Sequence, residues 1–108
     1  MRYAVLSDIH ANLESLRAVL ADATSRADGI LCLGDTVGYG ADPGPCVEMM
    51  AERATAWVAG NHEWGVAGLL DPGWFSLPAR AALEWTGEHL SGDGRRYLGA
   101  LPLVTEVG

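Results

Sequence analysis

Three short polar clusters in the sequence carry side chains of the types that bind metal ions. The first contains Asp8 and His10, the second contains Asp35, and the third contains Asn61 and His62. Carboxylate, imidazole and amide oxygen donors are hard to borderline ligands, which suit Mn²⁺, Fe, Zn²⁺ or Mg²⁺ better than a thiolate-seeking metal. The residue types therefore predict a site for divalent metal ions.

The spacing within the clusters suggests a role for each side chain. Asp8 and His10 are two residues apart, so both can reach one ion from a single turn. Asp35 can bridge two ions, because a carboxylate has two oxygens. His62 follows the candidate ligand Asn61 and would point to one side of the centre, where an imidazole can protonate a leaving oxygen.

Each cluster follows a short apolar run, and these runs are Tyr3–Leu6, Ile30–Leu33 and Ala56–Ala59. Continuous apolar runs are typical of strands that are buried on both faces, as in parallel sheets. Binding sites of open α/β sheets lie at the carboxyl ends of the strands. The clusters are separated by about one β-α unit each, so we expect all three to converge at that edge.

The first helix is predicted directly after the first cluster. Asn12 is a favourable residue for capping its amino terminus. Apolar residues recur at helical spacing and predict the face that packs on the sheet: Leu13, Leu16, Val19, Leu20 and Ala23.

Further helices are predicted at about Pro45–Arg53, Pro78–Leu90 and Gly94–Ala100, and Leu103–Val107 alternates like the beginning of another strand. The third helical pattern places four residues on one side: Ala81, Ala82, Trp85 and Leu90. The order β-α-β-α-β-α-α-β predicts an α/β layered domain with right-handed crossovers.

Composition excludes several classes of protein. The 108 residues are 49% hydrophobic and 19% charged, as in a globular domain. The net charge is −7 and all seven cations are arginine, so the basic footprint of a nucleic-acid-binding or membrane-surface protein is missing. No apolar run is long enough to span a membrane, and the first residues become polar too early for a signal peptide, so we expect a cytoplasmic location. Cys32 and Cys46 are interpreted as small core residues.

The three clusters in this order, each after a predicted strand, form a specific combination. The sequence resembles the calcineurin-like binuclear metallophosphoesterases in three motifs: Asp8-x-His10, Gly34-Asp35 and Gly60-Asn61-His62-Glu63. The stretches Ser7–Glu14 and Gly34–Pro43 are similar to a small bacterial branch described as predicted phosphodiesterases or as diadenosine-tetraphosphatase-like. The resemblance extends over essentially the whole chain.

The resemblance implies a role for each matching residue. Asp8 and His10 would bind the first metal ion, Asp35 would bridge both ions, and Asn61 would bind the second. His62 would act as a general acid or stabilise the phosphoryl oxygens. The cofactors would be two divalent ions, with Mn²⁺ expected first and Fe, Zn²⁺ or Mg²⁺ as alternatives. A metal-bridging hydroxide would hydrolyse a small phosphoester or nucleotide, as a phosphodiesterase or phosphatase.

Two aromatic residues near the motifs are candidates for contact with the substrate. Tyr39 follows the second cluster, and the alternative for it is turn chemistry in a loop rich in glycine and proline. Trp64 directly follows the third cluster, and the alternative for it is packing in the core.

The family resemblance also implies an architecture, a layered α-β-β-α sandwich. Residues 1–108 would form its amino-terminal β-α-β-α-β half, as part of a single phosphoesterase domain that is incomplete at the carboxyl end. Family members complete the metal centre with later histidines, whereas the last histidine here is His89. An alternative is therefore a non-catalytic metal-binding half-domain that needs a partner chain or self-associates as a homo-oligomer. A plain α/β binding domain with accidental motifs is a third interpretation.

Overall fold

A three-stranded parallel sheet forms the centre of the structure, a computed structural model that describes residues 1–108. The strands are β1 (Tyr3–Leu6), β2 (Gly29–Cys32) and β3 (Ala56–Trp57), in the spatial order β1-β2-β3. Leu6 pairs with Cys32, and Cys32 pairs with Trp57. The three strands therefore end at nearly the same level, which confirms the predicted parallel α/β arrangement.

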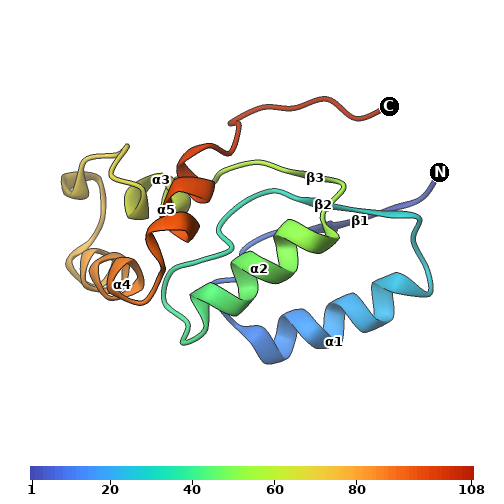
Figure 1. Cartoon of the computed structure of the whole chain (residues 1–108), viewed down its shortest axis with the longest axis horizontal. Coiled ribbons are helices and arrows are strands. Elements are labelled where there is room, and N and C mark those ends of the chain that lie inside the picture. Colours follow the sequence, from blue (N-terminus) through green and yellow to red (C-terminus); the bar gives the residue numbers. More distant parts are fainter.

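Two helices, α1 (Leu13–Thr24) and α2 (Pro43–Arg53), lie side by side along one face of this sheet (Figure 1). The predicted cap of α1 is present, because Oδ1 of Asn12 accepts a hydrogen bond from the backbone N–H of Ser15 at 3.1 Å. The second helix begins at Pro43, two residues earlier than predicted, and proline is favourable in a first turn because its missing N–H has no helical partner there.

The main core lies between the sheet and these two helices. The sheet contributes alternate residues, because successive side chains of a strand point to opposite faces. The buried side chains of this layer come from all five elements and include Leu6, Leu16, Leu20, Ile30, Cys32, Cys46, Val47, Met50 and Trp57. Both cysteines are buried and free, as predicted.

The opposite face of the sheet is open. Val5 and Leu33, which alternate with the buried strand residues, are 59% and 54% exposed. No helix of the chain covers this face in Figure 1.

The remaining elements gather beyond the carboxyl ends of the strands (Figure 1). They are α3 (Asn61–Val66), a single 3₁₀ turn η1 (Pro72–Trp74), α4 (Leu77–Glu88) and α5 (Gly92–Gly99). Helix α3 packs against α4 and α5. A second small core is formed by Phe75, Ala79 and Leu83. None of the helices is both long and apolar enough to cross a membrane.

Two predicted helix faces are partly wrong. Val19 is half exposed, since it lies beside β1, which is the edge strand, and the sheet does not extend beneath it. In α4 the buried residues are Ala79, Leu83 and Thr86 instead of the predicted Ala81, Ala82 and Trp85. Leu90, the fourth residue of the predicted face, lies just after α4 and is buried in the main core. The apolar pattern did not indicate the buried face of α4 because Thr86 is polar. Thr86 is nevertheless buried, since its hydroxyl donates a hydrogen bond to the carbonyl of Ala82 at 2.7 Å.

Two further element predictions need correction. The short helix α3 was not expected, and Leu103–Val107 is not a strand. The carboxyl-terminal segment makes a hydrogen bond with the extension of β3, from the N–H of Ala59 to the carbonyl of Pro102 at 2.8 Å, and the pairing goes no further. Alternation of apolar residues encodes which face a strand would bury, but it does not supply a neighbouring strand.

Candidate metal centre

The loops that follow β1 and β2 are joined by backbone hydrogen bonds beyond the ends of the strands. The N–H of Asp8 donates to the carbonyl of Gly34 at 3.1 Å, and the N–H of His10 donates to the carbonyl of Asp35 at 2.9 Å. The N–H of Ala11 continues the series with the carbonyl of Thr36 at 2.8 Å. This pairing aligns the first two polar clusters, although neither loop is a strand.

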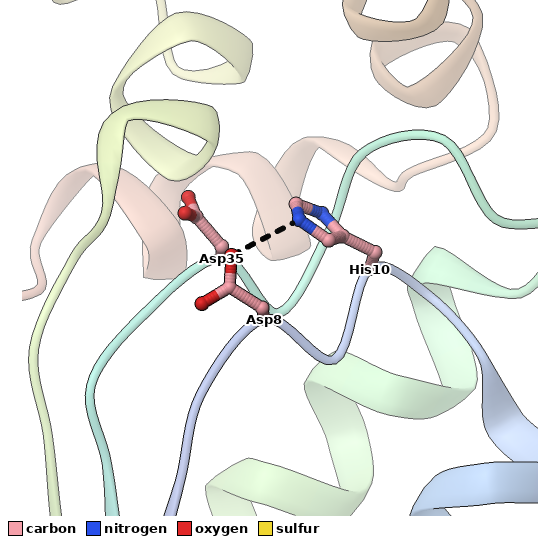
Figure 2. A group of neighbouring side chains, drawn as sticks. All are labelled: Asp8, His10 and Asp35. Carbon is pink, nitrogen blue, oxygen red and sulfur yellow. Dashed lines mark ion pairs between the residues drawn. The ribbon is translucent and has the colours of Figure 1, made fainter.

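The alignment brings three of the predicted ligands together at one point (Figure 2). One donor atom from each of Asp8, His10 and Asp35 can be chosen so that all three lie within 4.8 Å of one another. The Asp8 side chain is exposed, and the other two residues are partly buried. Two carboxylates and one imidazole at this spacing are a donor set that fits a divalent ion of the borderline class.

The orientation of His10 also fits a metal ligand. Its Nδ1 atom lies 3.1 Å from the carbonyl oxygen of Val37, and its Nε2 atom lies 3.3 Å from Oδ1 of Asp8. A carbonyl only accepts hydrogen bonds, so Nδ1 carries the proton and Nε2 is the atom available to a cation. A second hydrogen bond of this type orients most metal-binding histidines.

The carboxylate of Asp8 is held by its neighbours. The hydroxyl of Ser7 donates to Oδ2 of Asp8 at 2.6 Å. This hydrogen bond, followed by the nearby His10, lowers the pKa of Asp8 below its ordinary value, while partial desolvation opposes the shift. The carboxylate is therefore available in its ionised, metal-binding form.

The backbone of this edge is strained in a way the rest of the chain is not. Five residues other than glycine have a positive φ, and all five lie in the loops after β1 and β2: Asp8, His10, Ala11, Asp35 and Tyr39. Each such residue costs on the order of 1 kcal/mol or more, and such residues cluster at functional sites. Three of the five are the predicted ligands of the cluster.

The third polar cluster reaches the same place through the start of α3. The N–H of His62 donates to Oδ1 of Asp35 at 3.2 Å. Gly60 passes so close to this carboxylate that a Cβ there would overlap Oδ1. Asn61 lies between Gly60 and His62 as the exposed first residue of α3.

His62 is enclosed by aromatic rings. Its ring centroid lies 4.9 Å from that of His10, 5.0 Å from that of Tyr39 and 5.6 Å from that of Phe75. The Nδ1 atom is buried and has no hydrogen-bond partner. Burial lowers the pKa of His62, and the carboxylate of Asp35 opposes this shift.

The two candidate substrate residues are placed differently. Tyr39 is exposed, and its ring lies against those of both His10 and His62. Trp64 is partly buried on α3, and it is not among the rings that surround His62.

Three residues with no predicted role belong to this site. Ser7 holds Asp8, Phe75 packs on His62, and Glu63 is completely buried beneath the loops. The sequence could have indicated the role of Glu63, because a glutamate three residues after a helix cap typically accepts a hydrogen bond from the backbone N–H of the cap residue. The Gly60 N–H donates to Oε1 of Glu63 at 2.8 Å, and this bond marks the start of the unexpected helix α3.

A parallel sheet whose carboxyl edge gathers two carboxylates and an imidazole defines a metal-binding α/β domain. The chain belongs to the calcineurin-like phosphoesterase family, whose model matches residues 1–105. This match confirms the family resemblance identified from the three motifs.

Individual relatives agree with this assignment. A crystal structure of a metallophosphoesterase from Sphaerobacter thermophilus is 44% identical and has a TM-score of 0.82, covering 100% of this chain and 44% of that one. A crystal structure of a "putative diadenosine tetraphosphatase" is 25% identical with a TM-score of 0.71, covering 94% of this chain and 43% of that one. An uncharacterized protein of Methanocaldococcus jannaschii, MJ0912, is 43% identical over 104 residues.

The extent of the match is also informative. The chain spans 43% of the length of the M. jannaschii relative and a similar share of the two crystal structures. The chain therefore has the metallophosphoesterase fold over the part of those structures that it covers.

Proposed function

We propose that this chain carries the metal-binding strand ends of a phosphoester hydrolase, and that Asp8, His10, Asp35 and Asn61 hold two divalent ions. The observation that carries the proposal is the meeting of Asp8, His10 and Asp35 donor atoms within 4.8 Å, from loops after two different strands. Mn²⁺ is the ion we expect first, since carboxylate and imidazole donors suit it.

The chain's own residues account for the chemistry of binding and orientation. Divalent ions at this site would supply water activation and would neutralise charge on a phosphoryl group. Asp35 has one oxygen held by the N–H of His62, which fixes the carboxylate between the second and third loops. His62 lies beside His10 and is proposed to donate a proton to the leaving oxygen or to contact the phosphoryl oxygens.

The proposed substrate is a small phosphoester or a nucleotide, hydrolysed as by a phosphodiesterase. A net charge of −7 disfavours long nucleic acids, and the name of one structural relative includes a dinucleotide polyphosphate. Tyr39 is proposed to border the substrate because its exposed ring touches both histidines. Trp64, on α3, is retained as a second candidate for substrate contact, and the location we propose is cytoplasmic.

The test is metal binding and turnover by the purified 108-residue chain. Mn²⁺ binding is measured by electron paramagnetic resonance, and hydrolysis is measured with bis(p-nitrophenyl) phosphate. We expect Asp35→Asn to weaken Mn²⁺ binding by at least about tenfold and to abolish any Mn²⁺-dependent hydrolysis. Asp22→Asn, at an exposed carboxylate of α1, is the control and leaves both unchanged. Equal Mn²⁺ affinity in the wild type and Asp35→Asn would contradict the proposal.

A second candidate is a non-catalytic metal-binding half-domain that pairs with another copy of itself. The open sheet face with its exposed Val5 and Leu33 favours it, because exposed apolar surface promotes association. Sedimentation velocity separates the two candidates. Concentration-dependent dimers that Val5→Lys dissolves support the second one, and a monomer at all concentrations removes it.

A further inference from the structure

Glu63 is a fully buried carboxylate directly beneath the candidate metal centre. Its exposed fraction is 0%, and none of the ion pairs in the structure includes it. A buried carboxylate without a cation is unfavourable unless hydrogen bonds replace its water. Burial raises the pKa of Glu63, and backbone N–H groups oppose that shift. The identity of those N–H groups indicates what the side chain does.

The carboxylate of Glu63 accepts from both strand-end loops that flank it. Oε1 accepts from the N–H of Asp35 at 2.6 Å and from the N–H of Gly60 at 2.8 Å. Oε2 accepts from the N–H of Val37 at 3.5 Å. One side chain therefore joins the loop after β2, which carries Asp35, to the loop after β3, which carries Asn61.

The same hydrogen bonds extend to the loop after β1. Val37 donates its N–H to Glu63, and its carbonyl accepts a hydrogen bond from Nδ1 of His10. The Asp35 residue whose N–H donates to Glu63 also accepts, through its carbonyl, from the N–H of His10. The position of the His10 ring thus depends on two residues that Glu63 holds.

We propose that Glu63 is a positioning residue that sets the separation of the metal ligands on the three loops without itself contacting an ion. The proposal rests on the proposed metal site, and its test includes a measurement that needs no metal. The carboxylate of Glu63 accepts hydrogen bonds from backbone N–H groups only, so it acts through the loops that carry Asp35, His10 and Asn61. Residues that orient metal ligands typically change metal affinity by about 10–100-fold when they are replaced.

Glu63→Gln is the variant that isolates this role. The amide oxygen can still accept from Asp35 and Gly60, but the amide NH₂ would face the N–H of Val37, which is also a donor. The variant keeps the volume of the side chain and loses the third hydrogen bond. We therefore expect loosening at Val37 first, and with it loss of the orientation of His10.

Two matched variants separate positioning from stability and from charge. Leu20→Ala removes a fully buried residue of α1 and lowers global stability away from the site. Glu48→Gln removes an exposed carboxylate of α2 and changes net charge by the same amount. Leu20 lies within α1 and Glu48 within α2.

The experiment measures amide hydrogen exchange by NMR in the metal-free proteins and Mn²⁺ affinity by electron paramagnetic resonance. In Glu63→Gln we expect exchange at Val37 to accelerate by about tenfold relative to the β1–β2 amides, and Mn²⁺ affinity to fall by about tenfold. Leu20→Ala should accelerate exchange globally and keep the Mn²⁺ affinity of the wild type. Glu48→Gln should change neither. Unchanged Val37 exchange, or equal loss of Mn²⁺ affinity in Leu20→Ala, overturns the positioning role.

The two proposals fail in different ways. If the wild type binds no Mn²⁺ while Glu63→Gln still loosens Val37, the metal site is wrong and the proposed role of Glu63 in setting metal ligands is overturned with it. If the wild type binds Mn²⁺ and Glu63→Gln binds it equally, only the role of Glu63 is overturned. Should Glu63→Gln not fold, the wild type still provides a test with diamagnetic Zn²⁺. Binding must slow exchange at Asp35, Val37 and Gly60, because coupling between sites is reciprocal, and the absence of slowing overturns the proposal.

Discussion

The Nδ1 atom of His10 lies 3.1 Å from the backbone carbonyl oxygen of Val37, and this contact determines which nitrogen of the ring is turned toward Asp8. The carbonyl requires a proton on Nδ1, so Nε2 is left 3.3 Å from a carboxylate oxygen. In a neutral ring these two atoms are both acceptors, and a cation between them satisfies both. The relationship joins a residue after β1 to one after β2.

This geometry predicts the tautomer of His10. In metal-free protein at alkaline pH, ¹⁵N NMR should show the Nδ1–H form, and addition of Zn²⁺ should shift the Nε2 resonance. His89 is an internal control, because its Nδ1 also faces a carbonyl, that of Trp85 at 2.7 Å, but no carboxylate cluster lies beside it. His89 should show the same tautomer and no Zn²⁺ response. An Nε2–H form of His10 would contradict the assignment.

Removal of the Ser7 hydroxyl should raise the pKa of Asp8. The hydrogen bond from Ser7 stabilises the ionised carboxylate and is the largest cause of the lowered pKa. Because the folded pKa is depressed, the associated stability is present above the unfolded pKa and is lost as pH falls through the folded pKa. In Ser7→Ala, ¹³C NMR titration of the metal-free chain should place the Asp8 midpoint at higher pH than in the wild type.

Ser15→Ala is the matched control for that titration. Ser15 is an exposed serine of α1 whose backbone N–H, and not its hydroxyl, contacts Asn12. It should leave the Asp8 midpoint in place. A midpoint unchanged by Ser7→Ala would show that the hydroxyl does not donate to Asp8 in solution.

The sequence predicts which polar residues meet at the carboxyl edge of the sheet better than it predicts the surrounding helices, and the reason is physical. Parallel strands must end at a common edge, so residues such as Asp8 and Asp35 that follow buried runs are brought together by topology alone. The backbone conformation of the loops that carry these residues could not be predicted from the sequence. Aspartate tolerates a positive φ better than most residues, but local propensity does not specify that Asp35 adopts it, nor the pairing of loop amides that aligns Asp35 with His10.

The elements that were missed depend on tertiary contacts. Helix α3 has six residues, too few for an apolar period, and its start is fixed by the bond from Gly60 to Glu63. The buried face of α4 is defined by contact with Phe75, which the apolar pattern of α4 does not contain. Leu103–Val107 alternates as a strand does, but its residues find no neighbouring strand.

Gly38→Ala should destabilise the protein and disturb His62. Gly38 has φ of +97°, a conformation that other residues adopt at a cost on the order of 1 kcal/mol or more. A Cβ there would also overlap Nδ1 of His62. Gly44→Ala is the control, because a Cβ on that helical glycine meets nothing within 4 Å. Urea unfolding should show a larger loss of stability for Gly38→Ala than for Gly44→Ala, because only Gly38 has a positive φ.

NMR resonances near Gly38 provide a second, local measurement of the effect of Gly38→Ala. The ring proton resonances of His62 and Tyr39 should shift in Gly38→Ala, since these rings are in contact. They should stay in place in Gly44→Ala. Unchanged His62 resonances with a strong loss of stability would show that strain at Gly38, and not contact with the ring, determines the effect.

The buried thiol of Cys46 should make the stability of the protein fall at alkaline pH. Burial raises the pKa of Cys46 from 9.0 to about 11, so between these values the unfolded chain loses the proton and the folded chain keeps it. The unfolded state then binds fewer protons, and the free energy of unfolding decreases as pH rises through this range. Cys46→Ala should flatten this dependence in urea unfolding measured from pH 8 to pH 10.

The burial of Cys46 also predicts its slow reaction with a disulfide reagent at pH 8, because the thiolate is the reactive species. Ser25→Cys, which places a thiol at an exposed position after α1, should react at the rate of a free thiol. Fast reaction of Cys46 in the folded chain, or an unaltered pH slope in Cys46→Ala, would show that the α1–α2 layer opens readily around this residue.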